Sequence, residues 1–179
     1  KFHAVRGVGF VYKKAGKKIT PFLTGGGQEK DLRSTTENVA GIASMAKALR
    51  LVTDKEEFSL PKIAKMKKII FDELAKYEDI TIFSGEGEDF APNILTFGIK
   101  GVRGEVVVHA FEEHQIYIST TSACSSKAGK PAGTLISMGI PTKLAQTAVR
   151  ISLDDDNDMG QVEQFLTIFK QVYAKTQKV

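Results

Sequence analysis

Apolar residues recur every three or four positions in three parts of the chain, which predicts three amphipathic helices. The first covers 36–52. The polar stretch 53–58 is expected to end it, and a second helix is expected to begin near Ser59, with Pro61 in its first turn, where a missing N–H costs little. The third follows the acidic turn 154–158. Its broad apolar stripe consists of Met159, Val162, Phe165, Leu166, Phe169, Val172 and Tyr173.

Short apolar runs predict strands between the second and third helices. Three of them are expected at 80–85, 93–99 and 116–119. A fourth, within 146–153, alternates cleanly: Val149, Ile151 and Leu153 share one side, and Arg150 lies on the other. The alternation places Arg150 away from the apolar core.

Three further segments are assigned from local composition. Residues 104–114 are ambiguous, because three consecutive valines favour a strand, whereas Gly104 at the start and the Glu112, Glu113 pair fit a short helix. We expect the helix. A second short helix is predicted within 132–141, before Pro141, and an extended apolar segment at 5–13.

From about residue 59 the elements alternate as helix, two strands, helix, strand, loop, short helix, strand and helix. This order predicts a self-contained small α+β domain over 58–179. Residues 1–57 offer only a strand, a loop and one helix, which does not look self-sufficient. We interpret them as the C-terminal tail of a larger domain.

Composition limits the functional classes. The chain has 179 residues, 42% of them hydrophobic, and no apolar run approaches the length of a membrane span. One cysteine cannot form an internal disulfide, which fits a cytoplasmic protein, and one cysteine with three scattered histidines gives no zinc-type cluster. The net charge of +4 comes from lysines spread along helical faces, so solvated helices explain it more simply than direct nucleic-acid binding.

The single cysteine, Cys124, lies in "STTSACSSKAG", residues 119–129. A lone cysteine is often buried and structural. Small polar flanks instead favour a surface loop, where Lys127 and Lys130 could lower the pKa of the thiol and make it reactive. Both interpretations remain open from spacing alone.

Three other positions are ambiguous taken singly. Lys1 could be an ordinary surface lysine. The glycine-rich stretch 25–38 could hold a phosphate before a helix, or could be a turn with Thr35 or Thr36 as the helix N-cap. Arg150 is either a surface charge or a group that binds a carboxylate, since its planar fork suits that anion.

The order of four segments is more specific than any of them alone. "KFHAVRGVGFVY", "GGGQEKDLRSTTENVAGI", "STTSACSS" and "VRISL" together resemble the cysteine desulfurases of the NifS and IscS type. These are fold-type I, pyridoxal-phosphate (PLP) enzymes related to class V aminotransferases. The resemblance covers essentially the whole chain, which corresponds to the C-terminal half of such an enzyme.

The resemblance implies a role for four residues. Lys1 would form the Schiff base with PLP, and Thr36 would contact the PLP phosphate across a dimer interface. Arg150 would bind the substrate carboxylate, and Cys124 would be the nucleophile that forms a persulfide. Thr35 stands where the family usually has glycine, so the local backbone there is expected to be unusual.

The implied activity converts L-cysteine to L-alanine and leaves a persulfide on Cys124. The implied protein is a homodimer that passes sulfur to an acceptor, such as an iron–sulfur scaffold or a tRNA thiolation enzyme. Most cofactor contacts would come from the preceding half, so the chain alone is expected to be inactive. The alternatives are a selenocysteine lyase, another class V aminotransferase, or a non-catalytic module that docks a sulfur acceptor.

Overall fold

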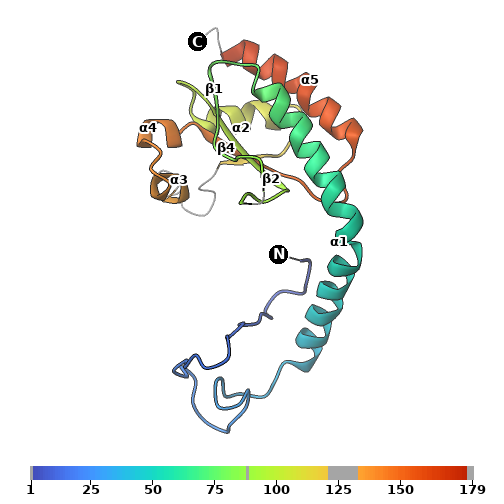
Figure 1. The fold of residues 1–179 in the computed structure, drawn as a ribbon, viewed down its shortest axis with the longest axis vertical. Coiled ribbons are helices and arrows are strands. Elements are labelled where there is room, and N and C mark those ends of the chain that lie inside the picture. Colours follow the sequence, from blue (N-terminus) through green and yellow to red (C-terminus); the bar gives the residue numbers. More distant parts are fainter. Residues whose placement is uncertain (1, 88, 121–132, 177–179) are drawn as a thin grey trace. The chain divides into compact units, whose positions relative to one another are not determined.

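The computed structural model describes residues 2–87, 89–120 and 133–176. The chain divides into two compact units, Lys1–Glu57 and Phe58–Val179 (Figure 1). In the first unit, the predicted strand at 5–13 does not form: residues 2–38 contain turns and bends and no strand. Phe10, Val11 and Tyr12 are 64%, 81% and 83% exposed. A strand needs a neighbour for its N–H and C=O groups, and this unit supplies none.

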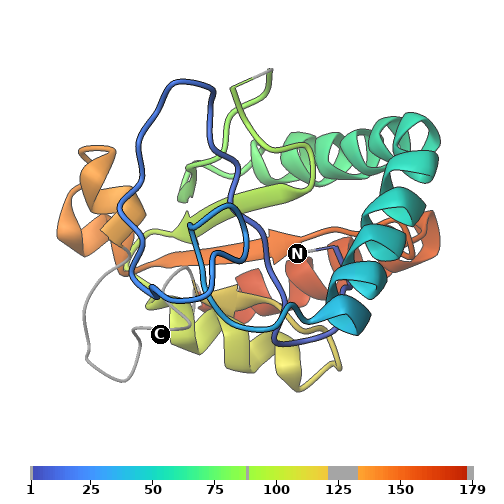
Figure 2. The same cartoon turned by 90° about the horizontal axis from the view of Figure 1, so that it is seen from below.

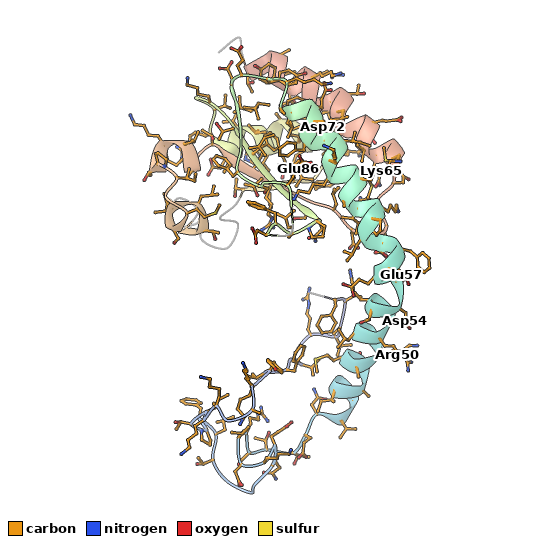
Figure 3. The ribbon with its side chains drawn as sticks, viewed as in Figure 1. Arg50, Asp54, Glu57, Lys65, Asp72 and Glu86 are labelled. Atoms are coloured by element: carbon orange, nitrogen blue, oxygen red, sulfur yellow. The ribbon has the colours of Figure 1, made fainter. Side chains whose placement is uncertain are left out.

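The predicted break at 53–58 is wrong. Helix α1 runs without interruption over Val39–Leu74, with Pro61 inside it. Polar residues such as Arg50, Asp54 and Glu57 are exposed helix formers, so their polarity marks a solvated stretch instead of an end (Figure 3). Ser59 is therefore not an N-cap. Pro61 leaves the carbonyl of Glu57 without its helical donor, at the boundary between the two units.

The second unit contains a four-stranded antiparallel sheet. Its strands are β1 (Ile80–Ile82), β2 (Ile94–Ile99), β3 (Ser119–Thr120) and β4 (Ala148–Ser152), in the order β1-β2-β4-β3. Strand β1 is shorter than predicted because the N–H groups of Phe83 and Ser84 both donate to the carbonyl of Thr96. Two residues opposing one is a β-bulge, which ends the regular pairing.

Four helices accompany this sheet. They are α2 (Gly104–Glu112), α3 (Gly133–Ser137), α4 (Thr142–Ala145) and α5 (Met159–Thr176). Helix α2 confirms the helical assignment, because Val107 and Phe111 are both buried at a spacing of four. Helix α4, which starts after Pro141, was not predicted. Within the described residues, no helix combines the length and apolar character needed to cross a membrane.

A single apolar core covers one face of the sheet. Helices α2 and α5 lie side by side on this face (Figure 2), and the second half of α1 joins them. The predicted stripe of α5 is confirmed, with Phe169 and Val172 fully buried. The strand residues of the core alternate along β2 and β4: Leu95, Phe97, Ile99, Val149 and Ile151.

A buried lysine fixes the loop between β1 and β2. Lys67 of α1 is 6% exposed, and its Nζ donates to the carbonyls of Gly85 at 3.2 Å and Ala91 at 2.9 Å. Burial lowers the pKa of Lys67, and the nearby Glu86 carboxylate partly offsets this. The ammonium therefore ties both ends of the loop to the helix.

A second charged group, Glu73, joins α1 to α5. Its carboxylate accepts from Lys76 at 2.5 Å and pairs with Lys170 at 3.3 Å. The hydrogen bond from Lys76, aided by Lys170, holds the pKa of Glu73 below its usual 4.5, against the effect of burial. A carboxyl with a lowered pKa in the folded state stabilises the fold above its unfolded pKa and loses that contribution in acid.

Glu73→Gln should therefore lower the free energy of unfolding at pH 7 by about 1 kcal/mol. The deficit relative to the unsubstituted chain should shrink as pH falls below about 4.5 and vanish once Glu73 is protonated in both states. Urea unfolding at pH 7 and pH 3 measures this. The control is Glu163→Gln, an exposed residue of α5 that forms no salt bridge among the described residues. A deficit of equal size at both pH values would contradict the prediction.

Candidate functional site

Two of the four predicted site residues lie within the described structure. Arg150 belongs to the second unit and Thr36 to the first, and each is described within its own unit. Lys1 and Cys124 lie outside the described residues. Across the ranges 2–87, 89–120 and 133–176, no group of three or more His, Cys, Asp or Glu side chains is placed to hold a metal ion.

Arg150 lies in the middle of β4, on the face of the sheet opposite the main core. Its neighbours along the strand, Val149 and Ile151, are 0% and 5% exposed and belong to that core. Because side chains alternate along a strand, Arg150 projects from the other face, as the sequence predicted. The packing of the core therefore determines from which face of the sheet the Arg150 side chain projects.

The Arg150 side chain is partly buried. Its Nε is shielded from solvent and has no hydrogen-bond acceptor within the part of the chain that the structure describes. Among the described residues no carboxylate pairs with the guanidinium. A buried, unpaired donor on a charged group is costly, and the cost is removed when an anion binds. Since Nε and one Nη together form a bidentate fork, a carboxylate is the anion whose geometry suits this site best.

Residues on two neighbouring strands flank Arg150. Thr96 of β2 is its partner on one side, and Ser119 of β3 is its partner on the other. Directly opposed residues have Cβ atoms about 5 Å apart. The three side chains therefore form a row across the sheet, which we call the polar row: Thr96, Arg150 and Ser119.

The polar row was only partly visible in the sequence. Arg150 stands out in the sequence, but Thr96 does not. The signal that could have found it is the alternation within β2, where Leu95 and Phe97 point to the core and Thr96 to the other face. Thr96 is 8% exposed, which makes it a buried polar residue next to a partly buried cation.

In the first unit, the N-cap of α1 is neither Thr35 nor Thr36. Asn38 has this role, since its Oδ1 accepts from the N–H of Gly41 at 3.0 Å. The Thr36 side chain is exposed, and its hydroxyl has no partner within the described part of the chain. A hydroxyl not used by the helix is available to a phosphate oxygen. Thr36 thus fits the part of the PLP site that the resemblance assigns to it.

The residue before Thr36 has the unusual backbone expected of it. Thr35 has φ of 151°, in the region that favours glycine. Its hydroxyl accepts a hydrogen bond from Nη1 of Arg33. The loop therefore keeps a glycine-like conformation with a β-branched residue, at a cost on the order of 1–3 kcal/mol.

Comparison with known proteins places the whole chain in one family. The family model described as Aminotransferase class-V matches residues 1–165. The chain belongs to the aminotransferase class-V family. A class-V relative, the NifS/IcsS protein homolog of Lactobacillus delbrueckii subsp. bulgaricus, is 46% identical over 179 residues, which is all of this chain and 46% of that protein.

Two further proteins are similar to this chain. Cysteine desulfurase IscS of Dictyoglomus turgidum is 28% identical over the full chain and 45% of its own length. The crystal structure of a NifS-like protein from Rickettsia africae superposes with a TM-score of 0.73 at 31% identity, over 88% of this chain and 41% of that one. The chain thus spans about half the length of the relatives it matches.

The backbone at Thr35 gives a testable prediction. Thr35→Gly should relieve the backbone strain at φ 151°, and this should outweigh the added entropy of the unfolded chain. The free energy of unfolding of this loop should rise by about 1 kcal/mol. The Ser34 amide, which donates to the Leu23 carbonyl, reports on this loop. Its hydrogen-exchange protection should rise about fivefold.

The matched control is Thr24→Gly, which lies in the same unit and does not have a positive φ. There the extra glycine should lower protection or leave it unchanged. Equal changes in the two variants would show that Thr35 carries no strain.

Proposed function

We propose that the protein carrying this chain is a PLP-dependent cysteine desulfurase. It removes sulfur from L-cysteine, gives L-alanine and leaves a persulfide on Cys124. Membership of the class-V family and the names of its relatives support the proposal. The observation that carries it is the pairing of Arg150, the residue suited to a carboxylate, with Ser119, five residues before Cys124.

The short stretch of chain between Ser119 and Cys124 makes this pairing relevant to the proposed reaction. Five residues span at most about 18 Å, so the length of the chain after Ser119 would allow a thiol at position 124 to reach an anion bound by Arg150. An amino-acid substrate held by its carboxylate presents its side chain a few ångströms away. Arg150 would therefore orient the substrate, and a thiol on the connected segment could reach the substrate sulfur.

PLP, when bound, supplies the electron sink that this class of chemistry requires. Lys1 and Thr36 are the residues of this chain that would hold it, Lys1 through its amine and Thr36 through a hydrogen bond to the phosphate. Lys1 would also move the proton at the substrate α-carbon.

Sulfur transfer requires one bond to form and one to break. The Cys124 thiolate attacks the substrate sulfur and forms an S–S bond, and the C–S bond of the substrate breaks. The electron pair of that bond stays on carbon, which takes a proton and becomes the methyl group of alanine. The persulfide on Cys124 then passes its outer sulfur to an acceptor thiol.

The assembly belongs to the same proposal. Residues 1–57 would be the tail of the larger PLP-binding domain, and 58–179 the small domain. The first unit exposes large apolar side chains, including Phe22 at 96%, which supports further protein contacts there. The complete enzyme would be a cytoplasmic homodimer. Its acceptor would be an iron–sulfur scaffold or a tRNA thiolation enzyme.

Replacement of the thiol tests this function. Cys124→Ser in the full-length, PLP-loaded protein should abolish both alanine and sulfide production from L-cysteine, because serine cannot form a persulfide. The cofactor absorption band should be unchanged. Alanine is measured by chromatography and the persulfide by mass spectrometry of the peptide that contains Cys124, the one cysteine of these 179 residues.

The matched control is Ser126→Ala, two residues away in the same segment, which should keep full turnover. Full turnover by Cys124→Ser would contradict the proposal. Transfer of an amino group with no sulfide released, by the unsubstituted protein, would favour the aminotransferase alternative.

A further inference from the structure

The backbone of Thr96, which lies next to Arg150 in the polar row, is held by three hydrogen bonds. The N–H of Thr96 donates to the Ser84 hydroxyl at 2.8 Å. Its carbonyl accepts from Phe83 at 2.8 Å and from Ser84 at 3.3 Å. The β-bulge thus uses all of the backbone polar groups of Thr96 on the β1 side. These contacts fix the backbone of Thr96 and therefore the face of the sheet from which its side chain projects.

The face beside the polar row is already filled at one end. A Cβ added at Gly98 would overlap the Thr147 hydroxyl, which itself donates to the Leu144 carbonyl at 2.8 Å. A small cluster closes this end of the face with α3 and α4: Phe83, Leu135, Ala145 and Ala148. The polar row lies next to that cluster on the same face of the sheet.

The requirements of a carboxylate exceed what Arg150 provides. Two carboxylate oxygens accept about four hydrogen bonds, and a bidentate arginine supplies two. Thr96 is on the same face as Arg150, and the Cβ atoms of the two residues are about 5 Å apart. The Thr96 hydroxyl is a buried donor beside the cation, and no hydrogen bond from it to another described residue competes with this role.

We propose that Thr96 is a specificity-determining residue of the carboxylate site. Its hydroxyl donates a hydrogen bond to the same substrate carboxylate that Arg150 binds. The inference rests on the proposed function, since it assumes an α-amino-acid substrate. It assigns Thr96 to substrate binding, and the electron movement of the reaction does not involve it.

The test removes the hydroxyl without changing the shape of the side chain. In the full-length, PLP-loaded protein, Thr96→Val should weaken binding of L-alanine about tenfold, as expected for one hydrogen bond to a charged group. The KM for L-cysteine should rise by a similar factor, and kcat should change less than twofold. Binding is followed through the cofactor absorption spectrum.

A substrate analogue separates specificity from structure. Cysteamine has the amine and thiol of cysteine but no carboxylate, so Thr96→Val should leave its dissociation constant unchanged. The matched control is Thr81→Val, the same substitution on the same face of the sheet in β1, opposite Gly98. It should leave the dissociation constants of both ligands unchanged.

Each outcome is decisive. If Thr96→Val binds L-alanine as Thr81→Val does, the assignment is wrong. If it weakens cysteamine and L-alanine equally, Thr96 acts through structure and the assignment is again wrong. If the valine variant does not fold, Thr96→Ser and Thr96→Ala replace it, and the assignment requires that serine retain the affinity alanine loses. If the unsubstituted protein releases no alanine from L-cysteine, the proposed function fails, whatever Thr96 does.

Discussion

The two-residue period of β2 and β4 is the constraint on which the second unit depends. Leu95, Phe97, Val149 and Ile151 can reach one core only if the residues between them point the other way. A slip of one residue in the pairing would bury Arg150 among phenylalanines and expose the core. The hydrophobic effect that fixes the register therefore also fixes the position of Arg150 between Thr96 and Ser119 on the opposite face. The same pairing register thus determines both the packing of the core and the geometry of the polar row.

Most of the second unit could be predicted because its signals are local. Alternation at Val149 and Ile151 and helical spacing in α5 mark faces that the core then uses. The errors occur where longer-range contacts decide. The bulge at Phe83 and Ser84 shortens β1 through pairing with Thr96, a residue twelve positions from Ser84. The polarity of Asp54 and Glu57 predicts a break, which is wrong because exposed charged residues continue a helix well.

The candidate site divides in the same way. The face of Arg150 followed from periodicity and is confirmed. Its unpartnered Nε could not be predicted, because burial of one atom depends on every surrounding element. The sequence predicts Thr35 or Thr36 as the cap of α1, but the cap is Asn38, because several adjacent residues could cap the helix and the backbone geometry selects one of them. The roles of Lys1 and Cys124 stay predictions from the family resemblance.

Lys67 gives this fold a built-in chemical reporter. The chain has many lysines, but this one is 6% exposed and its Nζ is engaged by the carbonyls of Gly85 and Ala91. An amine-reactive reagent would modify exposed lysines first and reach Lys67 only when the loop between β1 and β2 opens. The rate at which Lys67 is modified therefore measures how often the loop between β1 and β2, which hydrogen-bonds the backbone of Thr96, opens. The measurement uses a single atom and needs no substitution.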